Sequence, residues 1–344
     1  MKAIVVEKYG SPDVLKLAEV DKPVPRENEV LIKVKAASLN AFDWHMLLPD
    51  PFMVRLMGGG LLKPKNRILG TDMAGRVEAA GKNVVQFKPG DEVYGDLARW
   101  GCGACGEYVC APEEALGLKP GNMTFEQAAA VPMAALTALQ GLRDKGHIRE
   151  GQKVLVNGAS GGVGTFAVQL AKHFGTEVTA VCSAGNVEMA RSLGADHVID
   201  YAREDFTRSG RQYDLILAAN GFHPLADYKR ALAPGGSYVM TGGSMRQIFQ
   251  AMLLAPWYSM TGGKKMGGIT AHANQKDLVF VKELMEAGKV VPVIDRVYPL
   301  AEVPEALRYL LAGHARGKVV IKVEGAGDGP QKSKNSSNKE QIWA

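Results

Sequence analysis

The stretch from Val154 to Gly175, VLVNGASGGVGTFAVQLAKHFG, constrains the fold more than any other part of the chain. A short apolar run ends in a glycine-rich turn, and a helical pattern of apolar residues follows at once. Glycine permits a tight turn and lets a helix approach a sheet closely. The free N–H groups at the start of a helix can hold a pyrophosphate. This order of elements predicts the strand, turn and helix of a dinucleotide-binding domain.

Strand-like and helix-like segments alternate after this turn. The helix-like segments end at glycines such as Gly175 and Gly194, as helices commonly do. Repeated strand–helix–strand order favours a parallel sheet that is covered by helices on both faces. The predicted strands cover residues 153–159, 177–183, 197–200, 213–220 and 235–243.

Residues 1 to about 120 have a different pattern. Short β-branched runs are separated there by Gly, Pro and Asn turns, which predicts a β-rich domain. Helical spacing begins near Phe125, with Thr124 as a suitable N-cap. A further helix is predicted over 274–290, and residues 301–323 predict a helix followed by a last strand.

Composition is consistent with two globular domains. The chain has 344 residues, of which 46% are apolar and 22% are charged, so it can bury two cores and remain soluble. The formal net charge of +5 is not gathered into a dense Lys/Arg run with aromatic residues between. No nucleic-acid partner is therefore expected.

No segment predicts export or membrane insertion. The N-terminus enters an alternating apolar pattern directly, without the features of a signal peptide. The apolar stretch 250–259 is far too short for a transmembrane helix, which needs about 20 residues; a lid, a partner contact or a peripheral membrane contact remains open for it. We expect a cytoplasmic protein with no transmembrane segment and no disulfides. Residues 325–344 have almost nothing to bury and are expected to be disordered.

The glycine-rich turn supplies the first expected cofactor contacts. Its glycines at 158, 161 and 164 depart slightly from G-x-G-x-x-G spacing, but the turn lies between a strand and a helix, as the motif requires. A purely structural turn in another α/β protein is the alternative. The expected contacts are Gly158, Ala159, Gly161, Gly162, Val163 and Gly164.

The end of the next strand bears on the choice between NAD(H) and NADP(H). An acidic residue there would bind the ribose hydroxyls of NAD(H), but Cys182, Ser183 and Ala184 occupy the place. The Ser183 hydroxyl can donate a hydrogen bond to a phosphate, which favours NADP(H) over NAD(H). No Lys or Arg follows directly. The nearest residues that could close over a 2′-phosphate are Arg191, Tyr201 and Arg203.

Several motifs together resemble the medium-chain dehydrogenase/reductase superfamily. They are GTDMAGRVEAAGKNVVQFKPGDEVYG, AAVPMAALTALQGL, VNGASGGVGTFAVQLAKHFG and RSLGADHVIDY. More narrowly, NAFDWH, TGGSM, GGKKMG and GHARGKVVIKV resemble its zinc-free branch of zeta-crystallin-like quinone oxidoreductases. The resemblance covers about residues 1 to 323.

The resemblance implies an α/β fold with two domains. A GroES-like, β-rich catalytic domain would comprise 1–122 and 292–324, because the chain of such proteins returns to its first domain at the end. A Rossmann domain with a doubly wound parallel sheet would comprise 123–291 and bind NADP(H). A homodimer formed by edge strands of the cofactor domains is usual in the family.

The same resemblance argues against catalytic zinc. Asn40 stands where the zinc-binding members have an early Cys ligand, and GTDMAG at 70–75 replaces their Gly-His-Glu segment. The segment CGACGEYVC contains Cys102, Cys105 and Cys110, but a closed structural site normally needs four ligands. We therefore expect no metal.

The resemblance also implies a set of site residues, each with a simpler alternative. Asn40 and Asp43 would line the cleft as catalytic residues, although either could cap a turn or helix. Thr137 would place its hydroxyl near the nicotinamide, although it could bond its own helix. The expected substrate-pocket residues are Trp44, His45 and Tyr258. Further cofactor contacts are expected at the ends of later strands and beyond, from Tyr201, Asn220, Thr241, Gly242, Gly243 and Asn274.

Without zinc, alcohol oxidation would lose its main activating device. Quinones and α,β-unsaturated carbonyls are already electrophilic, so positioning and exclusion of water would suffice for their reduction by NADPH. The expected function is therefore zinc-independent hydride transfer from NADPH to a small quinone or enone. Reduction of enoyl thioesters, with Tyr94 or Tyr258 as proton donor, and a non-enzymatic NADPH-binding sensor or scaffold are the alternatives.

Overall fold

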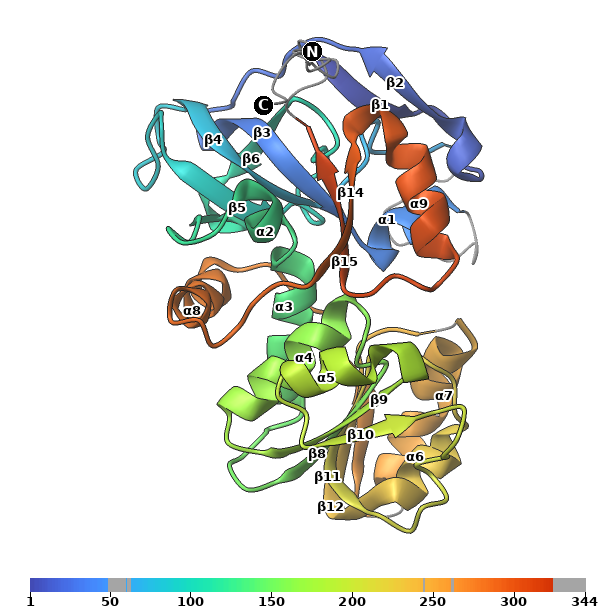
Figure 1. Ribbon diagram of the computed structural model, residues 1–344. Helices are drawn as coiled ribbons and strands as arrows, with labels where there is room; N and C mark the ends of the chain where they lie inside the picture. Colours follow the sequence, from blue (N-terminus) through green and yellow to red (C-terminus); the bar gives the residue numbers. More distant parts are fainter. Residues whose placement is uncertain (49–59, 61–62, 244, 261–262, 324–344) are drawn as a thin grey trace, which may run out of the picture.

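The computed structural model describes residues 1–48, 60, 63–243, 245–260 and 263–323. These residues form two units, each built around its own sheet, which stack one above the other (Figure 1). The tail expected to be disordered, 325–344, lies outside the described residues. The architecture is α/β, as expected, with a β-rich unit and a second unit built on a parallel sheet.

The first unit is the β-rich one expected from the N-terminal sequence. Its larger sheet has the strand order β14-β15-β3-β4-β5-β7, with β6 pairing beside β3, and β1 pairs with β2 in a small separate ribbon. Antiparallel pairing joins β3 to β4, β6 and β15. The strands are β1 (Lys2–Val6), β2 (Leu15–Glu19), β3 (Glu29–Leu39), β4 (Asp72–Ala80), β5 (Glu92–Asp96), β6 (Tyr108–Pro112), β7 (Leu116–Leu118), β14 (Ile294–Pro299) and β15 (Lys318–Lys322).

The chain leaves this sheet after β7 and returns to it with β14 and β15. Ile321 of β15 pairs with Ala37 of β3, near the other end of the sequence. Both strands are apolar and buried, so the returning segment completes the core of the first unit. The C-terminal strand thus belongs to the sheet that the first strands begin.

The second unit contains a parallel sheet in the order β10-β9-β8-β11-β12-β13. Each of its pairings is parallel. The order reverses between β8 and β11, and ligands of such sheets bind at the carboxyl ends of the strands flanking that reversal. The strands are β8 (Lys153–Asn157), β9 (Glu177–Cys182), β10 (His197–Asp200), β11 (Tyr213–Ala218), β12 (Leu232–Met240) and β13 (Lys265–Gly268).

Some helix boundaries agree with the local sequence signals, whereas the helix at Met245–Met260 was not predicted. Thr124 caps the first helix after the β-rich segment: its hydroxyl accepts from Gln127 N at 3.2 Å, and the Gln127 side chain accepts from Thr124 N at 2.9 Å. The helices are α1 (Ala41–Leu47), α2 (Phe125–Ala129), α3 (Pro132–Gln140), α4 (Gly162–His173), α5 (Val187–Ser192), α6 (Leu225–Ala231), α7 (Met245–Met260), α8 (Gln275–Glu286) and α9 (Val303–Leu311). No helix in the described part of the chain is long and apolar enough to cross a membrane.

The glycine-rich turn brings α4 against the end of β8. Gly158 has φ +80°, and a Cβ there would lie 2.7 Å from Asn220 N, at the end of β11. A Cβ on Gly164 would lie 2.1 Å from Gly158 O. A Cβ on Gly161 would meet nothing closer than Gly158 O at 3.6 Å. The turn is therefore packed at two glycines and open at the third.

We expect Gly164→Ala to lower the free energy of unfolding by about 1–3 kcal/mol, because the added methyl must push the first turn of α4 away from Gly158. Urea unfolding measures the change. Gly121→Ala is the matched control, since a Cβ on Gly121 meets nothing within 4 Å. Equal stability of the two variants would contradict the close packing of this turn.

Candidate functional site

The start of α4 faces the carboxyl ends of the central strands. The N–H groups in the first turn of a helix have no acceptor within that helix, so they can bind an anion. A Cβ on Gly161 would meet only Gly158 O, at 3.6 Å, and the Gly161 backbone forms an isolated parallel bridge with Gly317. The turn from Gly158 to Gly164 thus leads into a helix start of the kind that can bind an anion.

A buried polar cluster lies beside the same turn. Its centre is the ammonium of Lys318, at the start of β15, which donates to Asn40 Oδ1 and lies 3.4 Å from Asp72 Oδ2. The Lys318 side chain is 3% exposed and that of Asp72 is fully buried. A Cβ on Gly162 would lie 3.1 Å from Lys318 Cδ, so the lysine passes directly by the glycine-rich turn.

Further donors complete the cluster around Asp72. Asn40 Nδ2 donates to Asp72 Oδ2 at 2.9 Å, Ser38 Oγ donates to the same oxygen at 3.1 Å, and Met133 N of α3 donates to Oδ1 at 3.0 Å. Burial raises the pKa of the Asp72 carboxyl, while the Lys318 ammonium and these three donors oppose the rise. An ion pair and a hydrogen-bond network thus hold Asn40 in one orientation.

Two more buried carboxyls adjoin the cluster. Asp43 Oδ2 accepts from Asn40 N at 2.7 Å, and Asp43 Oδ1 has no hydrogen-bond partner among the described residues. Asp96 lies opposite Asp72 in the pairing of β4 with β5. Burial raises the pKa of Asp43 to about 7. Burial, with the Asp72 charge, raises the pKa of Asp96 to about 7 as well.

The structure shows that Asn40, and not Asp43, caps a helix. Asn40 is the N-cap of α1, and Asp43 is the third residue of that helix. Asp43 therefore supports the helix start by accepting from the Asn40 backbone, as in half of a capping box. The Asn40 side chain belongs to the buried cluster, and the Asp43 side chain adjoins it.

Thr137 is a buried residue of α3, 9% exposed. It follows Met133 by four residues, so the two lie on one face of the helix. Met133 N, in the first turn of this helix, donates to Asp72. The structure brings Asn40 and Asp43 together at the cluster, and it places Thr137 further along the helix whose first turn contacts Asp72.

The other expected cofactor residues are distributed along the sheet edge. Asn220 Oδ1 accepts from Gly221 N at 2.8 Å beyond β11, and Thr241 directly follows β12, with Gly242 and Gly243 after it. Asn274 caps α8, accepting from Asp277 N at 2.9 Å and donating to Asp277 Oδ2 at 2.8 Å. Its amide is engaged in this cap.

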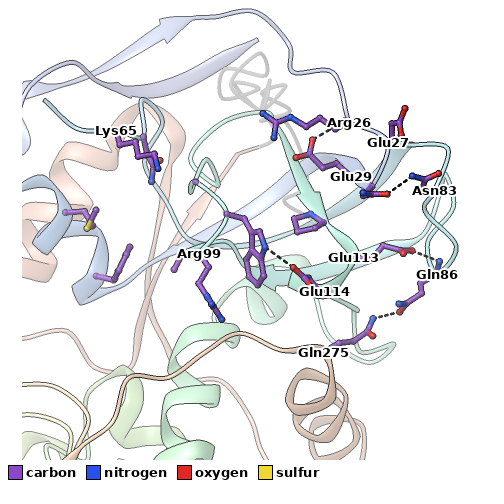
Figure 2. A pocket seen from close by; sticks show the side chains of 18 of the residues that line it. Arg26, Glu27, Glu29, Lys65, Asn83, Gln86, Arg99, Glu113, Glu114 and Gln275 are labelled. Atoms are coloured by element: carbon purple, nitrogen blue, oxygen red, sulfur yellow. Dashed lines mark hydrogen bonds between the residues drawn. The ribbon is translucent and has the colours of Figure 1, made fainter. Parts of the chain in front are cut away.

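An open groove of about 1700 Å³ adjoins α1 (Figure 2). At one end it is lined by Phe42, His45 and Met46 of α1 and by Arg99 and Trp100. Its far end carries several acidic and amide side chains, including Glu27, Glu29, Asn83, Gln86, Glu113 and Gln275 (Figure 2).

The three expected pocket residues do not come together. Trp44 and His45 of α1 lie with their ring centroids 3.6 Å apart, and burial lowers the pKa of His45. Tyr258 belongs to α7 and packs against the core of the second unit, with Lys229 Nζ 4.6 Å from the centre of its ring. His45 lines the groove, whereas Tyr258 contacts α6.

Sequence reasoning missed Lys318 and Asp72. Both lie in motifs that carried the family resemblance, yet neither was expected to function in the site. A polar residue at the start of each apolar strand was the available signal: Asp72 precedes MAGRV, and Lys318 precedes VVI. The spacing along the chain could not show that the two meet.

The described residues contain no group of three or more His, Cys, Asp or Glu side chains placed to hold a metal ion. Cys102 and Cys105 are free thiols. Burial raises the pKa of the Cys102 thiol to about 12.

The Lys318–Asp72 pair predicts a strong coupling in stability. Lys318→Met alone leaves the buried Asp72 carboxylate without its cation and is expected to cost about 3–5 kcal/mol of unfolding free energy. The double variant Asp72→Asn, Lys318→Met removes both charges and should be less destabilised than the sum of the single changes. Urea unfolding at pH 7 of the wild type, Asp72→Asn, Lys318→Met and the double variant gives the coupling free energy between the two side chains. Lys322→Met, an exposed position on β15, is the control.

Asp43 predicts a pH dependence of stability. Because burial raises its pKa to about 7, the folded protein holds this proton more tightly than the unfolded chain, whose carboxyl titrates near pH 4. This contribution is complete below about pH 4 and is lost as the pH rises to about 7. Asp43→Asn keeps an oxygen for Asn40 N but cannot titrate.

The melting temperature of Asp43→Asn relative to wild type should therefore rise from pH 4.5 to pH 8. Thermal unfolding in buffers across this range measures the difference. Asp21→Asn, at an exposed position, is expected to follow the wild type throughout. A constant difference between Asp43→Asn and wild type would refute a raised pKa of Asp43.

Comparison with known proteins places both units. The family described as "Alcohol dehydrogenase GroES-like domain" matches residues 26–141, and the one described as "Zinc-binding dehydrogenase" matches residues 193–321. The chain is 35% identical to the mitochondrial NAD(P)H oxidoreductase RTN4IP1 of Bos taurus, over 94% of this chain and 89% of that protein.

A second relative and a solved structure agree. The chain is 36% identical to 2-methylene-furan-3-one reductase of Solanum lycopersicum, covering 93% of this chain and 79% of that protein. The quinone oxidoreductase of Coxiella burnetii superposes with a TM-score of 0.83 at 32% identity, covering 94% of this chain and 99% of that one. These similarities, together with the two-unit fold and the glycine-rich turn described above, show that this chain belongs to the quinone oxidoreductase branch of the medium-chain dehydrogenase/reductase superfamily.

Proposed function

We propose that this protein is a zinc-independent reductase that transfers hydride from NADPH to quinones or α,β-unsaturated carbonyls. The observation that carries the proposal is the position of Lys318. Its side chain passes Gly162 of the cofactor turn and ends on Asn40 and Asp72, so a dinucleotide on that turn would extend toward the polar cluster. The relatives named for quinone and furanone reduction support the choice of acceptor.

The residues of the turn fit a dinucleotide. The free N–H groups at the start of α4 would hold the pyrophosphate, and the strand ends at Asn220 and Thr241 would border the nicotinamide half. When bound, NADPH supplies the hydride. Thr137 and Asn40 would orient the reacting rings, and the groove beside His45 would admit a flat acceptor.

Reduction of enoyl thioesters has less support from the described side chains. Tyr94 is fully buried and its hydroxyl donates to Leu278 O at 2.7 Å, so it cannot serve as a proton donor to a ligand. Tyr258 packs against α6. A non-enzymatic NADPH-binding role is the second candidate. A reductase oxidises NADPH when an acceptor is added, whereas a sensor or scaffold binds NADPH without oxidising it.

The test is steady-state oxidation of NADPH by the full chain after EDTA treatment, with a small para-quinone and with a conjugated enone. We expect turnover that EDTA does not reduce. Thr137→Val should lower kcat/KM about tenfold, since loss of one orienting hydroxyl misplaces the reacting rings. Ser192→Ala, which removes an exposed hydroxyl on α5, should leave activity unchanged.

Binding of NADPH without turnover over a panel of quinones and enones would contradict the reductase and favour the sensor or scaffold. Activity that is lost with EDTA and restored by zinc would contradict zinc independence. We also propose domain boundaries at 122/123 and 291/292, a homodimer and a cytoplasmic location. Gel filtration and cell fractionation test the last two; the bovine relative is mitochondrial.

A further inference from the structure

The 2′-phosphate of NADP(H) requires a cation that the residues around Ser183 do not supply. Ser183 begins the short turn after β9, and Asn186 Nδ2 donates to its Oγ at 3.0 Å, which leaves the hydroxyl proton free for another acceptor. Tyr201 stands nearby, because its N–H donates to Cys182 O at 3.2 Å. Neither residue carries a positive charge.

The arginines that are close in sequence are already paired. Arg191 Nη1 lies 2.7 Å from Glu188 Oε1, and Arg203 Nε lies 3.5 Å from Asp200 Oδ2. In each pair the two residues are three positions apart in sequence, so a carboxylate lies beside each guanidinium. These arginines are poor candidates for a phosphate contact.

Arg316 reaches the same place from the other unit. A Cβ on Gly185 would lie 3.5 Å from Arg316 Nη2, so the guanidinium lies over the turn that Ser183 begins. No carboxylate among the described residues is within ion-pair distance of it. Its charge is therefore available to an anion at the end of β9.

The backbone fixes Arg316 in this position. Arg316 N donates to Asp295 Oδ2 at 3.0 Å, and the next residue, Gly317, donates to Ser160 O at 2.8 Å. Gly317 has φ +79°, and a Cβ there would lie 2.3 Å from Val293 O, so the chain can turn here only with glycine. The segment that carries Arg316 is thus fastened to the glycine-rich turn itself.

We infer that Arg316 binds the 2′-phosphate of NADP(H), together with the Ser183 hydroxyl, and determines the preference for NADPH over NADH. The inference rests on the proposed function only in that the chain must bind a nicotinamide dinucleotide. The phosphate site is built from both units: the turn after β9 provides a hydroxyl, and the segment before β15 provides the charge. Arginine suits this role because its guanidinium can form a bidentate hydrogen-bond contact with a phosphate.

Titration calorimetry of the full chain with NADPH, NADH, 2′,5′-ADP and 5′-AMP tests the inference without any acceptor. The wild type should bind NADPH and 2′,5′-ADP more tightly than their counterparts without the 2′-phosphate. Arg316→Gln should weaken binding of NADPH and 2′,5′-ADP about 10- to 100-fold, as expected for loss of a charged hydrogen bond, and change NADH and 5′-AMP less than twofold.

Two further variants keep the interpretation specific. Arg203→Gln is the matched control and should leave the ratio of NADPH to NADH affinity unchanged. Arg316→Lys should recover part of the preference for NADPH over NADH, because a lysine keeps the positive charge but cannot form a bidentate contact. Rising salt should weaken NADPH binding to the wild type more than to Arg316→Gln.

Three results would overturn the inference. An unchanged ratio in Arg316→Gln would place the phosphate elsewhere, and equal weakening of all four ligands would make Arg316 a structural residue only. A wild type that does not prefer NADPH over NADH has no 2′-phosphate site, although a reductase using NADH would remain possible. Failure of the wild type to bind either dinucleotide would instead refute the proposed function.

Discussion

The contact of the Lys318 ammonium with Asn40 and Asp72 is the interaction on which the arrangement of the site depends. It joins three segments of the first unit, the start of α1, β4 and β15, at the point where that unit meets the glycine-rich turn of the second. Burying a lysine is costly unless a carboxylate and further hydrogen bonds satisfy it. Asp72 and Asn40 meet that requirement, and the network in turn holds Asn40 in one orientation.

The returning segment from α9 to β15 explains why the two units act as one site. Its strand completes the first sheet, its glycine at 317 bonds to the cofactor turn, and its lysine enters the polar cluster. Arg316, one residue earlier, lies over the turn after β9. A short stretch of three residues thus contacts the two ends of a potential dinucleotide site, so small shifts between the units would affect both.

The charge balance of the cluster is unusual for a buried region. Three carboxyls, those of Asp43, Asp72 and Asp96, accompany one lysine. Burial raises the pKa of Asp43 and of Asp96 to about 7, so each group ionises around neutral pH rather than near pH 4. The same burial makes the cluster sensitive to pH.

The sequence by itself determined the elements and their order, because strands, helices and turns are governed by contacts between near neighbours. Apolar runs, helical spacing and glycine turns predicted five of the six described strands of the second unit but neither β13 nor α7, and the family motifs predicted the return of the chain to its first sheet. Only the tertiary structure decided which side chains meet. Lys318 and Asp72 are 246 residues apart, and Arg316 reaches Gly185 from the opposite unit. Such contacts depend on sheet order and on the packing of one unit against the other, which no local pattern contains.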